Sequence, residues 1–95
     1  TWLFWVDILQ FLGEFESAIQ TLLQASEFYP EENEVEYRLA GLYFMIQDTT
    51  KAKFHLSNGL RLKFDNYILI EDLFPVVWTK KTVRNYIDKH KKNND

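Results

Sequence analysis

The sequence repeats itself at an offset of 34 residues, and this self-similarity constrains the fold more than any other feature. When the chain is shifted by 34 positions, side chains of similar size meet at the positions that set contacts between packed helices. Eight pairs follow this rule without a gap: Trp5/Leu39, Val6/Ala40, Leu9/Tyr43, Leu12/Ile46, Ala18/Ala52, Leu22/Leu56, Ala25/Gly59 and Phe28/Leu62. A repeat of this length is typical of stacked units that each contain one helical hairpin.

The spacing of apolar residues is helical along the whole chain. Glycine and proline are scarce, at three and two residues, and no stretch shows the alternating pattern of a strand. Six helical segments are expected, beginning near residues 2, 15, 33, 49, 65 and 79. Asn33 and Glu36 predict a capping box at the third segment, and Asp48 predicts an N-cap for the fourth. Pro75 is expected to kink or end the fifth, because proline lacks the N–H that a helix interior uses. The predicted fold class is therefore all-α, an α–α superhelix of three antiparallel hairpins.

The register resembles the tetratricopeptide repeat family over about residues 2–64, and more loosely over residues 66–92. The first copy carries Gly13-Glu14-Phe15 at the turn, and the second keeps Leu39-Ala40. The second copy has Gln47 where the turn glycine is usual. The resemblance implies a single domain over residues 1–95: repeat 1 at 1–32, repeat 2 at 33–66, and a degenerate capping hairpin with a basic tail at 67–95.

Charge is distributed unevenly between the two ends of the chain. Residues 1–37 hold eight acids and no Lys or Arg, whereas residues 79–95 hold six bases and two acids. Such polarity can orient a partner or order subunits in a stack. The basic tail is interpreted as a solvated helix end, because the wider basic surface of a duplex binder is absent. Nucleic acid is therefore disfavoured as a partner.

The sequence contains no constellation typical of an enzyme. There is no cysteine, and His55 and His90 lie far apart in the chain. Neither a glycine-rich phosphate loop nor a nucleophile motif is present. The acidic run at residues 31–36 is interpreted as a helix start favoured by the helix dipole, and not as a metal site. We expect no catalytic residue, no cofactor and no metal ligand.

Membrane and secretion signals are also not recognised. No apolar run reaches the roughly 18 residues that a membrane span requires. The first charged residue is Asp7, whereas a secretory leader starts with basic residues. The expected location is the cytoplasm.

The family resemblance implies a protein-interaction scaffold. In this family the first helix of each pair lines a concave face that holds an extended peptide or a helix of a partner. Carried over position by position, the partner-binding groove is expected to contain Phe11, Tyr37, Gly41, Phe44 and Met45. An exposed cluster of aromatic and methionine side chains is typical of a binding surface. The alternative, that Phe11, Phe44 and Met45 are core residues, stays open at this point.

The first helix is apolar on every side. Trp2, Leu3, Phe4, Trp5 and Val6 are consecutive, and such a helix is normally buried on every side. Terminal repeats normally carry a polar outer face, which this segment lacks. We therefore expect Trp2, Phe4 and Trp5 to form an oligomer face, either in a symmetric dimer or against preceding repeats. The alternative function is a structural, self-assembling segment of a longer solenoid, without a separate ligand.

Overall fold

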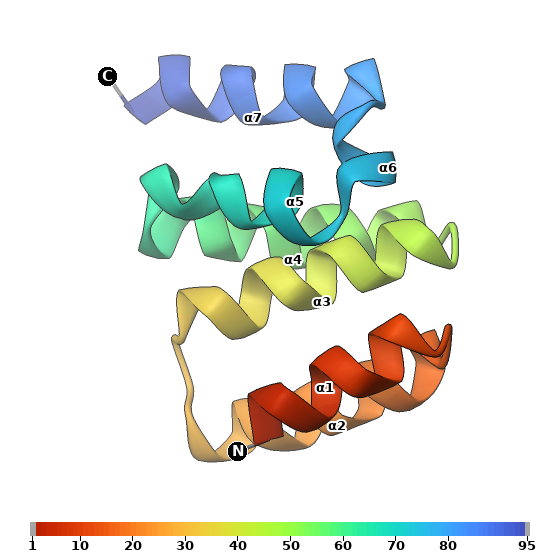
Figure 1. Cartoon of the computed structure of the whole chain (residues 1–95). Coiled ribbons are helices and arrows are strands. Elements are labelled where there is room, and N and C mark those ends of the chain that lie inside the picture. The colour runs from red at the N-terminus through yellow and green to blue at the C-terminus, as the bar shows by residue number, and fades with distance from the viewer. Residues whose placement is uncertain (1, 95) are drawn as a thin grey trace.

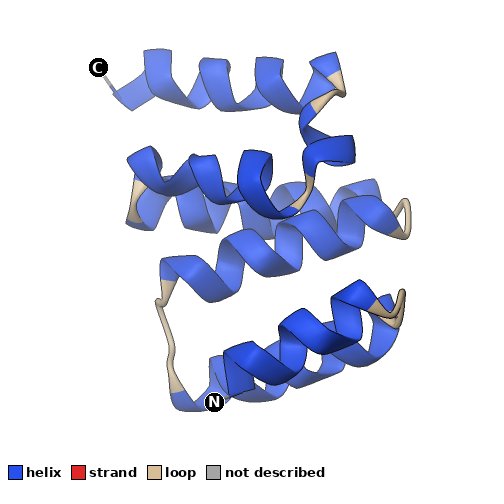
Figure 2. Ribbon diagram, viewed as in Figure 1, coloured by secondary structure: helices blue, strands red, loops and turns tan. Residues whose placement is uncertain are grey.

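The computed structural model describes the backbone of residues 2–94 and the side chains of residues 3–91 (Figure 1). Within this range the elements are all helices, and Figure 2 shows no strand. They are α1 (Trp2–Phe11), α2 (Phe15–Phe28), α3 (Asn33–Met45), α4 (Thr49–Leu62), the 3-10 helix η1 (Phe64–Tyr67), α5 (Ile68–Leu73), α6 (Pro75–Trp78) and α7 (Lys81–Asn94). The predicted all-α class is confirmed. None of the helices in residues 2–94 combines the length and the apolarity that crossing a membrane requires.

The 34-residue offset of the sequence recurs in the bounds of the first four helices. Helices α2 and α4 are each 14 residues long and are offset by 34, and α1 and α3 end at Phe11 and Met45, which share this offset. The turn inside each pair uses the same backbone conformation, with φ of 79° at Gly13 and 65° at Gln47. The first two hairpins are therefore equivalent in local structure, while their arrangement as a superhelix remains a prediction.

Replacing Gln47 by glycine is expected to stabilise the chain by about 0.5–1 kcal/mol. A side chain at positive φ costs roughly 1–2 kcal/mol, and the greater freedom of glycine in the unfolded chain offsets part of the gain. The reverse change at the equivalent turn, Gly13→Gln, is the matched control, because a Cβ there meets no atom within 4 Å. Urea denaturation should show the two variants shifting the unfolding free energy in opposite directions.

Helix α3 forms the centre of the molecule. It lies between the first hairpin and the C-terminal helices, with α2, α4 and α5 packed around it (Figure 1). Of the ten consecutive positions 35–44 in α3, nine are buried: Val35, Tyr37, Arg38, Leu39, Ala40, Gly41, Leu42, Tyr43 and Phe44. A helix apolar on nearly all sides is stable only when it is surrounded in this way.

The C-terminal segment departs from a simple hairpin. Helix α5 ends at Leu73, and Pro75 begins α6 at its first helical position, where the missing N–H is not needed. The predicted end of the fifth helix at proline is therefore confirmed. Instead of two helices, this part of the chain contains a 3-10 turn and three α-helices.

Capping follows the sequence prediction at one helix and not at another. The Asp48 carboxylate accepts a hydrogen bond from the Lys51 N–H at 3.3 Å, as an N-cap does. The capping box expected from Asn33 and Glu36 is wrong, because Asn33 is already the first residue of α3. Its Oδ1 instead accepts a bond from Asn66 Nδ2 at 2.6 Å. The Asn33 side chain therefore links α3 to η1 and does not cap α3.

Candidate protein-interaction surfaces

The concave groove expected from the sequence is filled by the chain itself. Tyr37 is fully buried and Phe44 is 6% exposed, while Gly41 lies beneath the ring of Phe74. The prediction that Tyr37, Gly41 and Phe44 line an open groove is therefore wrong. The physical reason is that α5 and the residues after it pack directly on α3.

The other two predicted groove residues lie in different surroundings. Met45 is half-buried and packs against the core. Phe11 is 90% exposed on α1. The structure therefore does not join the five predicted residues in one surface.

A polar cluster links α1 to the rest of the molecule. Arg38 Nη1 donates to Asp7 Oδ1 at 2.6 Å, and Glu34 Oε1 lies 3.5 Å from Arg38 Nη2. Gln10 Nε2 donates to the Leu73 carbonyl at 2.9 Å. The Arg38 side chain is only 7% exposed, and its Nε has no hydrogen-bond partner among the described residues. This arginine is therefore held in place by carboxylates and closes the space between α1 and α3.

Asp7→Ala is expected to destabilise the chain by about 2 kcal/mol, more than Arg38→Met does. Removing the carboxylate leaves a buried guanidinium with only the longer contact to Glu34, and an uncompensated buried charge is costly. The figure is below the 3–5 kcal/mol of a fully buried pair because Asp7 is half exposed. Arg38→Met removes the charge together with its unsatisfied Nε, so its cost should stay below about 1 kcal/mol. Urea denaturation of the two variants tests this order, and a larger loss for Arg38→Met would contradict it.

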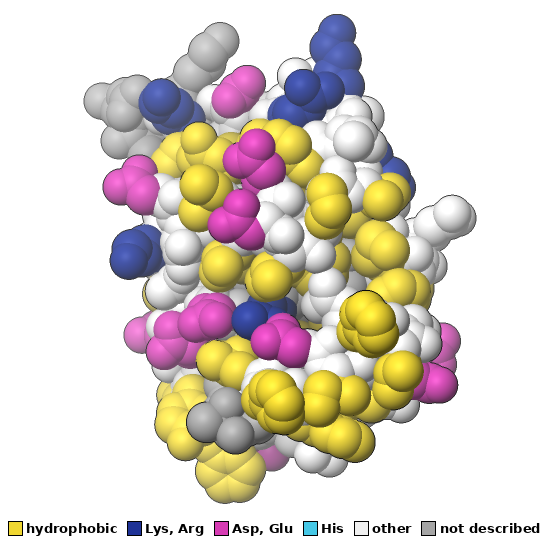
Figure 3. Space-filling view, in the orientation of Figure 1, with side chains coloured by type: hydrophobic (Ala, Val, Ile, Leu, Met, Phe, Trp, Pro, Cys, Tyr) yellow, Lys and Arg dark blue, Asp and Glu magenta, His cyan; other side chains and the backbone are white. Residues whose placement is uncertain are grey.

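Most of the exposed large hydrophobic residues that the structure describes lie on the first hairpin. Six large hydrophobic residues there are more than half exposed, and we call them the end face: Phe4, Trp5, Phe11, Leu12, Phe28 and Tyr29. Figure 3 shows hydrophobic atoms gathered over the lower end of the molecule, where this hairpin lies, and basic atoms over the opposite end. Phe4 and Trp5 of the predicted oligomer face are exposed, and the side chain of Trp2 lies outside the described residues, so that oligomer face stays a prediction.

The equivalent positions of the second hairpin show why this face is exposed. Leu39 is fully buried in α3, whereas its counterpart Trp5 is 52% exposed in α1. Helix α3 packs on α2 of the preceding hairpin, but in the described chain no hairpin precedes α1. Trp5, which the register placed among packing residues, is therefore exposed because its side of α1 has no neighbour among the described residues. Leu12 follows the end of α1, and both it and its counterpart Ile46 are exposed.

Acidic residues of the same hairpin are also exposed, and we call them the acidic rim. Glu14, Glu16, Glu27, Glu31 and Glu32 are all exposed. Since residues 1–37 contain no Lys or Arg, no base on this hairpin neutralises them. The first hairpin thus presents exposed apolar side chains together with exposed negative charges.

A pocket at the other end of the molecule was missed by sequence reasoning. It has a volume of about 250 Å³, and we call it the aromatic pocket; it is lined by Phe64, Tyr67, Trp78, Arg84, Ile87, Asp88 and Lys91. The rings of Tyr67 and Trp78 stack with centroids 5.8 Å apart, and Phe64 meets Tyr67 edge-on at 5.6 Å. This volume is below the roughly 300 Å³ at which small-molecule sites begin, so it suits one side chain better than a cofactor.

The two histidines have structural contacts. His55 Nδ1 lies 2.7 Å from Glu36 Oε2, and its ring stacks on Tyr43 with centroids 5.5 Å apart. These contacts tie α4 to α3. His90 Nδ1 lies 3.0 Å from the Tyr86 carbonyl. Among the residues that the structure describes, no three His, Asp or Glu side chains converge in the way a metal ion requires.

Comparison with protein-family models, with curated proteins and with solved structures finds no match to this chain. Function therefore has to be argued from its surfaces.

Proposed function

We propose that this chain is a protein-interaction module. Its end face binds a helix on the surface of another protein. The observation that carries the proposal is the exposure of six large hydrophobic residues on one hairpin of a small chain. An exposed apolar patch with a polar rim is typical of a protein-binding site. Burying one such side chain fully stabilises a complex by roughly 1.5–3 kcal/mol before the costs of association.

The spacing on α1 suits a helical partner. Phe4, Ile8 and Phe11 follow the i, i+4, i+7 spacing, so they form one stripe along the helix, and Val6 and Leu9 are buried. A stripe of this kind packs against the apolar stripe of a second helix. At the equivalent positions of the second hairpin, Arg38 and Leu42 are buried and Met45 is half-buried.

The acidic rim restricts the chemistry of the partner. A helix with an apolar stripe and basic flanks would place its Lys or Arg side chains beside exposed glutamates such as Glu16 and Glu27. An anionic membrane surface would instead be repelled by the same residues. The proposed partner is therefore a basic amphipathic helix.

Binding of a designed probe helix tests the proposal. The probe is a fluorescein-labelled peptide of about 15 residues, the length at which isolated helices begin to form. It carries leucine along one face and lysine on both flanks, and a peptide of the same composition in scrambled order is its control. We expect anisotropy to show saturable binding of the probe and at least tenfold weaker binding of the scrambled peptide.

Substitutions in the end face separate apolar contact from simple charge attraction. Phe4→Glu combined with Phe11→Glu should weaken probe binding at least tenfold, although it makes the surface more attractive to lysine. Phe54→Glu is the matched control, because Phe54 is 62% exposed on α4, outside the end face. The proposal fails if the double variant binds the probe as tightly as the unmodified chain does.

A further inference from the structure

We infer that the partner of the end face is a second copy of this chain, whose aromatic pocket receives the residue 28–32 loop. The inference rests on the proposed function, because Phe28 and Tyr29 belong to the end face. The proposed occupant of the pocket is an exposed aromatic ring followed by two carboxylates. The contact between the two copies is then head-to-tail.

The 28–32 loop carries both parts of this occupant. Phe28 is 79% exposed and Tyr29 is 53% exposed at the end of α2. Glu31 and Glu32 follow directly and are exposed, and Glu31 has a φ of 59°, which turns the chain sharply at this point. The loop therefore presents an aromatic side chain next to two negative charges.

The aromatic pocket carries the complementary groups. Its lining includes the stacked pair Tyr67 and Trp78, against which a further ring can pack in an offset or edge-on arrangement. Its rim includes Arg84 and Lys91, which have no ion-pair partner among the side chains that the structure describes. Asp88 stands between them and lowers the rim charge, while the neighbouring Lys89 is exposed. Asp65, between the lining residues Phe64 and Tyr67, is also exposed, so these three bases and two acids leave the surface around the pocket only slightly positive.

Lysine packed over aromatic rings already occurs inside the chain. Lys53 Nζ of α4 lies 5.8 Å from the centroid of the Tyr86 ring on α7, and Lys51 Nζ lies 5.8 Å from that of Tyr43. Basic side chains of α7 can cover the exposed rings of a second copy in the same way, with their aliphatic stems in contact with the aromatic faces. The basic side chains of α7 could therefore cover an aromatic surface although they are polar.

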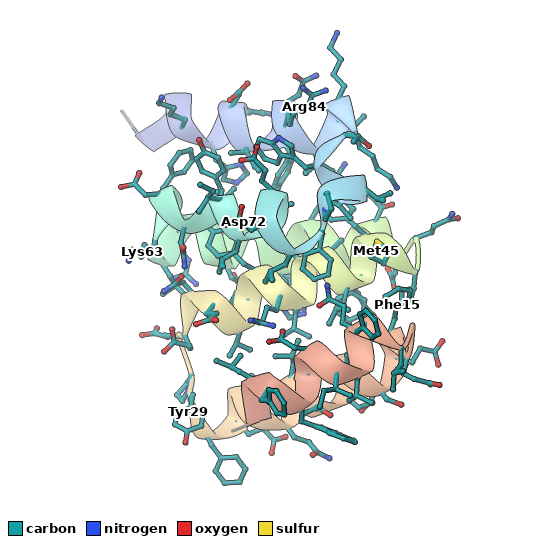
Figure 4. The ribbon with its side chains drawn as sticks, viewed as in Figure 1. Phe15, Tyr29, Met45, Lys63, Asp72 and Arg84 are labelled. Atoms are coloured by element: carbon teal, nitrogen blue, oxygen red, sulfur yellow. The ribbon has the colours of Figure 1, made fainter. Side chains whose placement is uncertain are left out.

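The loop and the pocket cannot meet within one molecule. Tyr29 lies at the lower end and Arg84 at the upper end of the view in Figure 4, with α3 between them. A contact between them is therefore intermolecular, and each contact leaves one loop and one pocket available for further copies. Such heterologous contacts form open chains, or rings where the rotation between copies closes. A symmetric dimer through two end faces would instead bring two acidic rims together.

Charge reversal with exchange of partners tests this inference. Variant A carries Glu31→Lys and Glu32→Lys, and variant B carries Arg84→Glu and Lys91→Glu; all four residues are exposed, and circular dichroism verifies that both variants keep their helix content. By sedimentation velocity at low salt, the unmodified chain should form species larger than a dimer, and each variant alone should associate at least tenfold more weakly. A one-to-one mixture of A and B should recover the association, because each variant supplies the charge that the other needs.

The outcomes separate this inference from the proposed function. Association of variant B as strong as that of the unmodified chain, or no recovery in the mixture, overturns the head-to-tail contact. A chain that stays monomeric at millimolar concentration also overturns it, while binding of the probe helix would still support the proposed function. Phe28→Ser should weaken association at least tenfold, whereas Phe54→Ser, which removes a ring that is 62% exposed on α4, should leave it unchanged.

Discussion

Gly41→Leu is expected to destabilise the chain by about 3 kcal/mol and to separate α5 from α3. A Cβ at position 41 would overlap the ring of Phe74, which is itself 3% exposed and lies in the core. The ring has no open space to move into, so the C-terminal helices have to shift as a group. Urea denaturation followed by circular dichroism measures the loss.

A double-mutant cycle shows whether the ring of Phe74 is the cause. Gly41→Ala gains up to about 1 kcal/mol of helix propensity but introduces the same overlap, so we expect a smaller net loss of about 1 kcal/mol. Phe74→Leu removes part of the ring and should make the alanine at position 41 tolerable. The double variant should thus be more stable than the sum of the two single changes predicts. Strict additivity would contradict the assigned contact.

Tyr37→Ala is expected to cost about 4 kcal/mol, in the range measured for buried aromatic residues. Tyr37 is fully buried in α3, and its hydroxyl donates to the carbonyl of Lys63 at 2.7 Å. A second carbonyl, that of Phe64, lies 3.2 Å away. Tyr37→Phe keeps the ring and removes only these bonds, so its cost should be about 1–2 kcal/mol. Equal losses in the two variants would show that the ring itself contributes little.

The same residue predicts a dependence of stability on alkaline pH. Burial, and secondarily the negative charge of Asp65, raises the pKa of Tyr37 far above its usual value of 10.0. Above pH 10 the unfolded chain loses the phenol proton while the folded chain keeps it, so unfolding releases a proton and becomes more favourable. The stability present below pH 10 should therefore fall by up to about 1.4 kcal/mol per pH unit above it. Urea denaturation of the unmodified chain and of Tyr37→Phe across pH 9–11.5 measures this effect. The unfolding free energy of Tyr37→Phe should fall less steeply with pH.

The sequence predicts the helices well because their signals are local. The shared offset of 34 residues reappears in the bounds of α2 and α4 and in the turns at Gly13 and Gln47. Asp48 and Pro75 also act where short-range chemistry places them, at a helix cap and at a helix start. Each of these features depends on residues within a few positions of one another.

The predicted groove failed because it depended on a contact between distant parts of the chain. Phe74 stands 34 residues after Ala40, a small residue of the second copy, and Gly41 stands in the middle of a helix. Each looks unfavourable alone, but the structure seats the ring over the glycine, so the two irregularities compensate each other. A pair of complementary size anomalies about one repeat apart is the signal that would have found this contact.

The aromatic pocket lay beyond sequence reasoning for a similar reason. Phe64 and Tyr67 come from a 3-10 turn, while Trp78 comes from the short helix after Pro75. Neither element has a strong periodic pattern, and the stacking of Tyr67 on Trp78 follows only from their three-dimensional arrangement. By contrast, the end face was partly predictable, because an all-apolar first helix is visible in the sequence.

The central position of α3 has a consequence for how the native chain opens. A helix covered by α2, α4 and α5 can expose its amides only when several of these neighbours leave together, whereas α1 has one side in water. Native-state hydrogen exchange should therefore be slowest in α3 and fastest at the two ends of the chain, with the first hairpin opening as a separate cooperative unit. A ligand bound to the end face would then slow amide exchange in α1 and α2 first. The exchange rates of these two helices would therefore report how much of the surface is occupied.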